Sequence, residues 1–174
     1  MTALSIDPKP APGLRAHHAI VGRLAYLALL PFGLGAALVW FVRADAHPHV
    51  VAAMSAYAAV VLAFLGGIHW GFGFAGAGAG AQPTVNLGAS AVGVAPVVPD
   101  TGLYVWGVMP ALVACLALLM PASAGLVIHA LMLVVCYLVD RKVYPVRGAG
   151  RWLTLRFRLS VGASLACFIA AAGS

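Results

Sequence analysis

The chain has 174 residues, of which 63% are hydrophobic and 8% charged, whereas soluble domains carry about 25% charged residues. This balance excludes a soluble globular domain and predicts one membrane-embedded domain. The net charge of +6 does not indicate nucleic-acid binding, because the cations lie near the ends of apolar segments and form no basic face. We therefore expect the lipid bilayer, and no nucleic acid, among the partners.

Residues 1–19 form a polar, proline-containing tail, which we expect to lie in the cytoplasm. Apolar segments follow that we predict to cross the roughly 30 Å of hydrocarbon in a bilayer. Pro31 should kink the first of them, which is too long for a cleaved signal peptide. The predicted fold is all-α, a polytopic membrane helical bundle over residues 20–171 with five transmembrane helices. The five predicted spans cover residues 20–42, 50–72, 103–120, 125–139 and 152–171.

A non-spanning linker, residues 73–102, is predicted between the second and third spans and begins with a Gly/Ala-rich run. Its part 84–99 is apolar but short, and it is broken by one asparagine and two prolines. We expect this part to be re-entrant, interfacial or a loop. The cations before the first span and those in residues 140–151 then share one side of the membrane. The positive-inside rule places the N-terminus in the cytoplasm and the C-terminus outside.

The second span carries small residues at four-residue steps, and such residues let another helix approach closely in a bilayer. His69 falls roughly opposite Gly67 on this helix, so we expect the helix to pack on more than one side. The predicted helix-packing residues are Ser55, Ala59, Ala63, Gly66, Gly67, Trp70 and Gly71.

Polar side chains in the spans are candidates for function, because burying ionisable groups in a membrane is costly. His69 could relay protons or bind a ligand, or it could simply fill the interface. His129 shares a helix face with Cys136 and Asp140, which could line a polar pathway, or it could be a buried histidine with one partner. Arg156 could point inward or only set the topology.

The predicted span directions bring His69, Asp140 and Arg156 to the cytoplasmic side of the bundle. We expect Asp140 to pair with Arg156 and to hold the fourth span against the fifth, with His69 within reach. The alternative is that Asp140 pairs in solvent with Arg141 or Lys142, where an ion pair contributes about 0–1 kcal/mol.

The sequence predicts no catalytic residue, no metal site and no cofactor. Two histidines of the loop at His47 and His49 are too few for a metal site, and His69 and His129 lie at different depths, which speaks against a shared haem. Three cysteines fall inside predicted spans, where they behave as small apolar residues. They are Cys115, Cys136 and Cys167.

Several motifs follow one another along residues 20–170. They include Leu30-Pro-Phe32, Leu65-Gly-Gly-Ile-His-Trp-Gly71, Trp106-Gly-Val-Met-Pro110 and Tyr144-Pro145. In these the chain resembles the transmembrane-protein-69-like family, although its linker before Trp106 is longer than that resemblance implies. The resemblance implies a small multi-span protein of bacterial or mitochondrial inner membranes. For this chain we expect the bacterial inner membrane. The resemblance implies no agreed activity.

Two functional hypotheses follow. The favoured one is a structural, accessory or assembly component of a larger membrane complex, in contact with other subunits or with a second copy. It rests on the small-residue helix faces and the short loops, which leave no room for a soluble catalytic site. The alternative is a small-molecule or ion carrier, or a membrane enzyme, that uses the His/Asp/Arg cluster. An odd number of spans and the lack of an internal repeat speak against a carrier.

The linker yields a topological prediction. Single cysteines that replace Ala81 and Asp100 should react with an impermeant thiol reagent from the same side of the membrane. Labelling from opposite sides would establish a sixth span and reverse the orientation of every helix after it.

Overall fold

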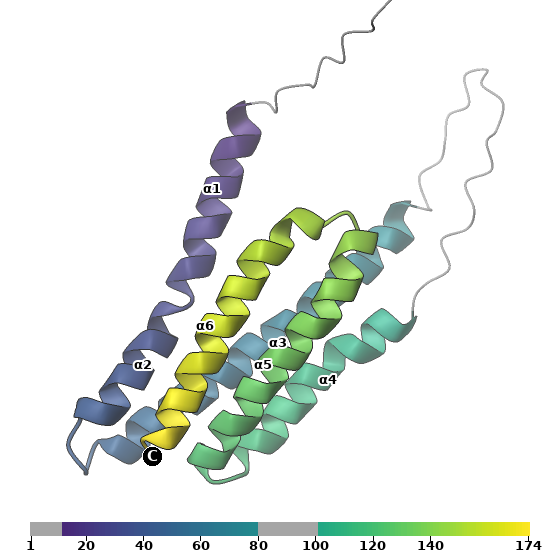
Figure 1. Cartoon of the computed structure of the whole chain (residues 1–174). Coiled ribbons are helices and arrows are strands. Elements are labelled where there is room, and N and C mark those ends of the chain that lie inside the picture. The colour runs from purple at the N-terminus through teal and green to yellow at the C-terminus, as the bar shows by residue number, and fades with distance from the viewer. Residues whose placement is uncertain (1–11, 80–100) are drawn as a thin grey trace, which may run out of the picture.

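The computed structural model describes residues 12–79 and 101–174, and these ranges form a helical bundle without strands (Figure 1). Five of its segments are long and apolar enough to cross a membrane. The predicted all-α membrane bundle with five spans is therefore confirmed. The helices are α1 (Pro12–Leu27), α2 (Leu30–Phe41), α3 (His47–Ala79), α4 (Thr101–Leu118), α5 (Ala122–Val146), the short 3-10 helix η1 (Gly150–Trp152) and α6 (Leu153–Ala172).

The first span is two helices joined at Ala28 and Leu29. Pro31 stands at the start of α2, and its ring nitrogen has no hydrogen to donate to the carbonyl one turn earlier, so the α-helix is interrupted before it. The chain continues with bonds from the Leu29 amide to the Tyr26 carbonyl (3.0 Å) and from the Gly33 amide to the Leu29 carbonyl (3.0 Å). Because of this break, α2 packs on α3 and α6 while α1 diverges from the bundle (Figure 1).

Helix α3 is the centre of the bundle and contacts α2, α4, α5 and α6. Its closest neighbour is α4, because Gly66 of α3 faces Gly107 of α4 and any side chain on Gly66 would overlap the Gly107 carbonyl oxygen. Trp70 of α3 donates its indole N–H to the Tyr104 carbonyl of α4 at 3.0 Å. Two glycines and one tryptophan thus fix the α3–α4 distance.

The ends of the bundle are joined by short connections where the structure describes them. His47 at the start of α3 contacts the Gly173 carbonyl after α6 at 2.9 Å. Helix α4 runs antiparallel to α3, so Ala79 and Thr101 lie at the same end (Figure 1). The segment 84–99, which we predict not to cross the membrane, lies outside the described residues and stays a prediction.

The α3–α4 contact generates a stability prediction. Gly66→Ala should destabilise the protein by about 1–3 kcal/mol, because the added methyl group forces two helix backbones apart. Gly67→Ala is the matched control, since a side chain at Gly67 meets nothing within 4 Å. Thermal unfolding in detergent measures both, and equal melting temperatures for the two variants would contradict the close packing.

Candidate functional site

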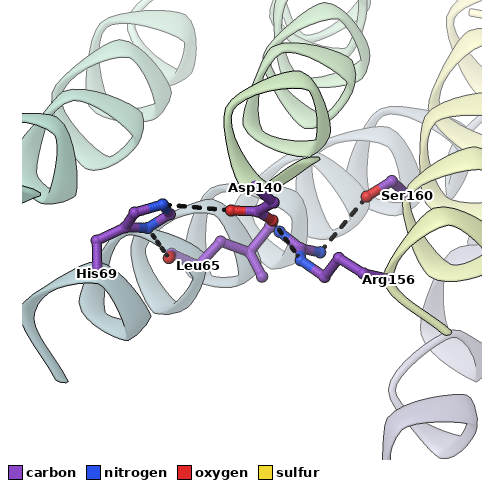
Figure 2. Close-up of polar contacts among 5 residues, drawn as sticks. All are labelled: Leu65, His69, Asp140, Arg156 and Ser160. Carbon is purple, nitrogen blue, oxygen red and sulfur yellow. Dashed lines mark hydrogen bonds and ion pairs between the residues drawn. The ribbon is translucent and has the colours of Figure 1, made fainter. Parts of the chain in front are cut away.

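Asp140 of α5 is the centre of a buried polar cluster (Figure 2). Its Oδ2 accepts a hydrogen bond of 2.6 Å from Nε of Arg156 on α6, and the two side chains are 1% and 10% exposed. Nη1 of Arg156 in turn lies 3.4 Å from the Ser160 hydroxyl one turn further along α6. The pairing expected from the sequence is present, and it joins two neighbouring helices inside the bundle.

His69 approaches the same carboxylate from α3 (Figure 2). Its Nδ1 lies 3.3 Å from the Leu65 carbonyl, and its Nε2 lies 3.3 Å from Oδ1 of Asp140. A carbonyl only accepts, so Nδ1 carries a hydrogen in this contact. A hydrogen bond between Nε2 and Oδ1 then requires one further proton, which either the imidazole or the carboxyl group would carry. Neither Nε2 nor Oδ1 completes a hydrogen bond among the described residues.

Aromatic rings enclose this cluster. The His69 ring stands edge-on to Phe72 and Trp106, with ring centroids 6.4 and 6.5 Å away. Phe72 packs in turn on Tyr144, at 5.3 Å, and the Tyr144 hydroxyl interacts with Arg156. The rings keep the charged groups in a low-dielectric environment, where unpaired charges are costly.

His129 belongs to a second polar site. Its ring contacts the Ser55 hydroxyl on α3 through Nδ1 (3.4 Å) and the Ala114 carbonyl on α4 through Nε2 (3.3 Å), and it is fully buried. Ser55 and His69 are both on α3, about 21 Å apart along the helix axis at 1.5 Å per residue. The structure therefore separates His129 from the Asp140 cluster, and each site ties α3 to other helices.

The predicted packing residues of α3 fall into two groups. Ser55, Ala59 and Gly66 are buried against other helices, and Trp70 lies across α4 with 40% of its surface exposed. Ala63, Gly67 and Gly71 face outward, and a side chain on either of these glycines would meet nothing within 4 Å.

The side chains of the Asp140 cluster are better suited to electrostatic interactions than to covalent catalysis. It offers one carboxylate, one guanidinium and one imidazole, which can hold helices together or accommodate a single proton between His69 and Asp140. No group of three His, Cys, Asp or Glu side chains with metal-binding geometry occurs within residues 12–79 and 101–174.

Two aromatic members of the cluster lie near the ends of spans, where tyrosine and tryptophan commonly face the membrane interface. Tyr144 is 5% exposed and turned inward, and the Trp106 ring is half-buried against His69. Tyr144 follows Asp140 by four residues on one helix and so shares its face. That spacing is the signal that could have identified it, whereas no sequence pattern links Trp106 to His69.

The Asp140–Arg156 pair generates a double-mutant prediction. Asp140→Asn and Arg156→Gln should each destabilise by about 3–5 kcal/mol, because each leaves a buried charged or polar partner unpaired. The double variant should lose clearly less than the sum, as measured by unfolding in mixed micelles.

The exposed pair Arg43 and Asp45 is the matched control. Its atoms are 4.0 Å apart and its side chains are 94% and 82% exposed, so Asp45→Asn and Arg43→Gln should each change stability by less than about 1 kcal/mol. Additive effects at Asp140 and Arg156 would show that the two side chains do not depend on each other.

A family model described as "Protein of unknown function (DUF3429)" matches residues 18–172, which is most of the chain, and the chain belongs to this family. No curated protein and no solved structure matches it in the corresponding searches. The matched residues include all five candidate spans and both polar sites.

Proposed function

We propose that this member of the DUF3429 family is a non-catalytic accessory subunit of a larger membrane complex, and that it binds a transmembrane helix of another subunit on the outer face of α3. The chain is a multi-pass membrane protein with five spans.

The outer face of α3 is the observation that carries the proposal. Ala63, Gly67 and Gly71 lie on it at four-residue steps, and all three are exposed. Small residues at this spacing permit close contact between helix backbones in a bilayer. Gly66, one position away, makes such a contact with α4 inside the protein. The outer stripe repeats that surface with no helix of this chain against it among the described residues.

Large side chains border this stripe. Val60, Phe64 and Phe74 are 65%, 69% and 61% exposed, so they would pack around a helix that rests on the glycines. Glycine lowers helix stability and contributes no side-chain contacts. Two such residues on an outward face are better explained by a close helix neighbour than by contact with lipid alone.

The interior polar groups support a structural role. His129 is bonded to Ser55 and to the Ala114 carbonyl, and the Ser164 hydroxyl donates to the Ala130 carbonyl at 3.1 Å. These contacts join helices of the bundle, and the three side chains that make them are buried. A carrier pathway through His129 would require water to reach a side chain that is fully buried.

For the setting, we propose the bacterial inner membrane with the N-terminus in the cytoplasm. The basic side chains after Asp140 follow α5 at the end of the bundle where α1 begins (Figure 1). The opposite end carries Arg43 and Asp45, whose charges cancel. This asymmetry supports placing the basic end in the cytoplasm, and the resemblance to transmembrane-protein-69-like proteins supports the choice of membrane.

One observation favours a second function. Nε2 of His69 and Oδ1 of Asp140 lie 3.3 Å apart, and neither atom completes a hydrogen bond among the described residues, so one proton could bind between them. A carrier or membrane enzyme that moves protons would use this pair. It would lose transport or activity in Asp140→Asn at a temperature where the variant stays folded, whereas an accessory subunit would lose only its stability.

Site-specific photo-cross-linking tests the accessory role. A photoreactive residue at Gly67 should cross-link to another membrane protein in native membranes. The same residue at Gly33 should not, since Gly33 is an equally open glycine on the exposed side of α2. Gly67→Leu should reduce recovery of the partner at least tenfold, because the side chain keeps the partner backbone at a distance, while the melting temperature of the isolated protein stays unchanged.

Cross-links of equal yield at Gly67 and Gly33 would contradict a specific surface. Cross-links only to a second copy of the chain would show a homo-oligomer and contradict the larger complex.

A further inference from the structure

An open hollow of about 320 Å³ lies beside the polar cluster, between the ends of α3, α5 and α6. At about 30 Å³ for each water in the liquid, this volume equals that of about ten water molecules. Most of its wall is apolar and includes Ile68, Leu155 and Leu159. Tyr144 and Arg156, whose side chains carry polar groups, also line it.

The turn between α5 and α6 borders this hollow and has a defined conformation. The Gly148 amide donates to the Pro145 carbonyl (3.2 Å) and the Ala149 amide to the Tyr144 carbonyl (2.8 Å), which is the Schellman pattern that ends a helix. Gly148 has a φ of 71°, a conformation that glycine adopts without strain. The turn therefore has a defined backbone, and its Ala149 lines the hollow.

Basic residues gather at the end of the bundle where the hollow lies. Ala149 and Trp152 of the turn line it, and Arg151 lies between these two residues in the sequence. Within residues 12–79 and 101–174 the only acidic side chain at this end is Asp140, and it is already bonded to Arg156. Exposed basic side chains therefore outnumber acidic ones among the described residues of this end. They are Arg141, Lys142, Arg151 and Arg158.

We propose that this hollow is a binding site for an anionic phospholipid. One acyl chain would lie along Ile68, Leu155 and Leu159, and the phosphate would lie at the level of the turn, within reach of Arg151. Basic pockets between helices at the cytoplasmic end of membrane proteins suit anionic headgroups, and arginine binds phosphate oxygens through paired N–H groups. The apolar wall requires a lipid, because free phosphate would leave it in contact with water.

Arg156 gives this site a role in the bundle. Its Nε is engaged by Asp140, and Nη1 points to Ser160. The Arg156 side chain is 10% exposed, and the residue lines the hollow. An anionic headgroup nearby would balance the cations around the turn without taking Arg156 away from its carboxylate.

Native mass spectrometry of the full-length protein in detergent, titrated with phosphatidylglycerol and with phosphatidylcholine, tests the site. The protein should retain phosphatidylglycerol in preference to phosphatidylcholine. Arg151→Gln should weaken phosphatidylglycerol binding about fivefold, the effect of one basic side chain near an anionic lipid surface. Leu155→Trp should fill the hollow and weaken the binding of the same lipid.

Arg158→Gln is the matched control, because Arg158 is exposed on α6 and lies 3.5 Å from the Tyr26 hydroxyl on α1, away from the hollow. It should leave the affinity unchanged. Equal retention of the two lipids by the native protein would overturn the proposal. Equal weakening by Arg151→Gln and Arg158→Gln would also overturn it. That result would show that the net charge of the protein attracts the lipid and that no specific site binds it. These measurements do not involve the outer face of α3, so they can fail while the accessory role stands.

Discussion

A carboxylate buried inside an apolar bundle must have partners, and Asp140 obtains them from two other helices. The isolated charge would be expensive in a medium that cannot solvate it. Arg156 of α6 provides the opposite charge at 2.6 Å, and His69 of α3 approaches the second oxygen at 3.3 Å. Three helices therefore share one relative position along the membrane normal at which all three side chains meet. A shift of one helix by a turn, about 5.4 Å, would separate them.

Attraction between apolar surfaces cannot set that position, because lipid tails are as apolar as the helix faces. Two kinds of contact set it in this protein. Close glycine contacts fix the distance between α3 and α4, where Gly66 and Gly107 meet. Hydrogen bonds fix the register of other helix pairs. Between α6 and α5, for example, the Ser164 hydroxyl donates to the Ala130 carbonyl. The charged cluster adds the specificity that these neutral contacts lack.

Much of the fold was predictable from the sequence, since long apolar segments and basic flanks identify spans and their order. The Asp140–Arg156 pair was predictable for a related reason: span directions bring both residues to one end, and Asp140 is the only acidic side chain among the described residues there. The contact face of α3 was harder to identify. Gly66 and Gly67 are adjacent, yet one meets α4 and the other faces outward. Inward and outward faces are both apolar in a membrane, so hydrophobic periodicity does not distinguish them. The inward position of Trp106 depends on the packing of α4 against α3, which no local pattern encodes.

Arg156 connects the interior of the protein with its surface. Besides the hollow near the α5–α6 turn, it lines a second one of about 120 Å³ that is bounded by the α1–α2 junction, α3 and α6. This second hollow lies beside the break before Pro31 in the first span. Arg156 thus binds a carboxylate and lines two mainly apolar hollows. A molecule bound in either hollow would lie against the side chain that joins α6 to α5 through a hydrogen bond of 2.6 Å. Binding at the lipid-facing surface would then act on the same residue that holds Asp140 in place.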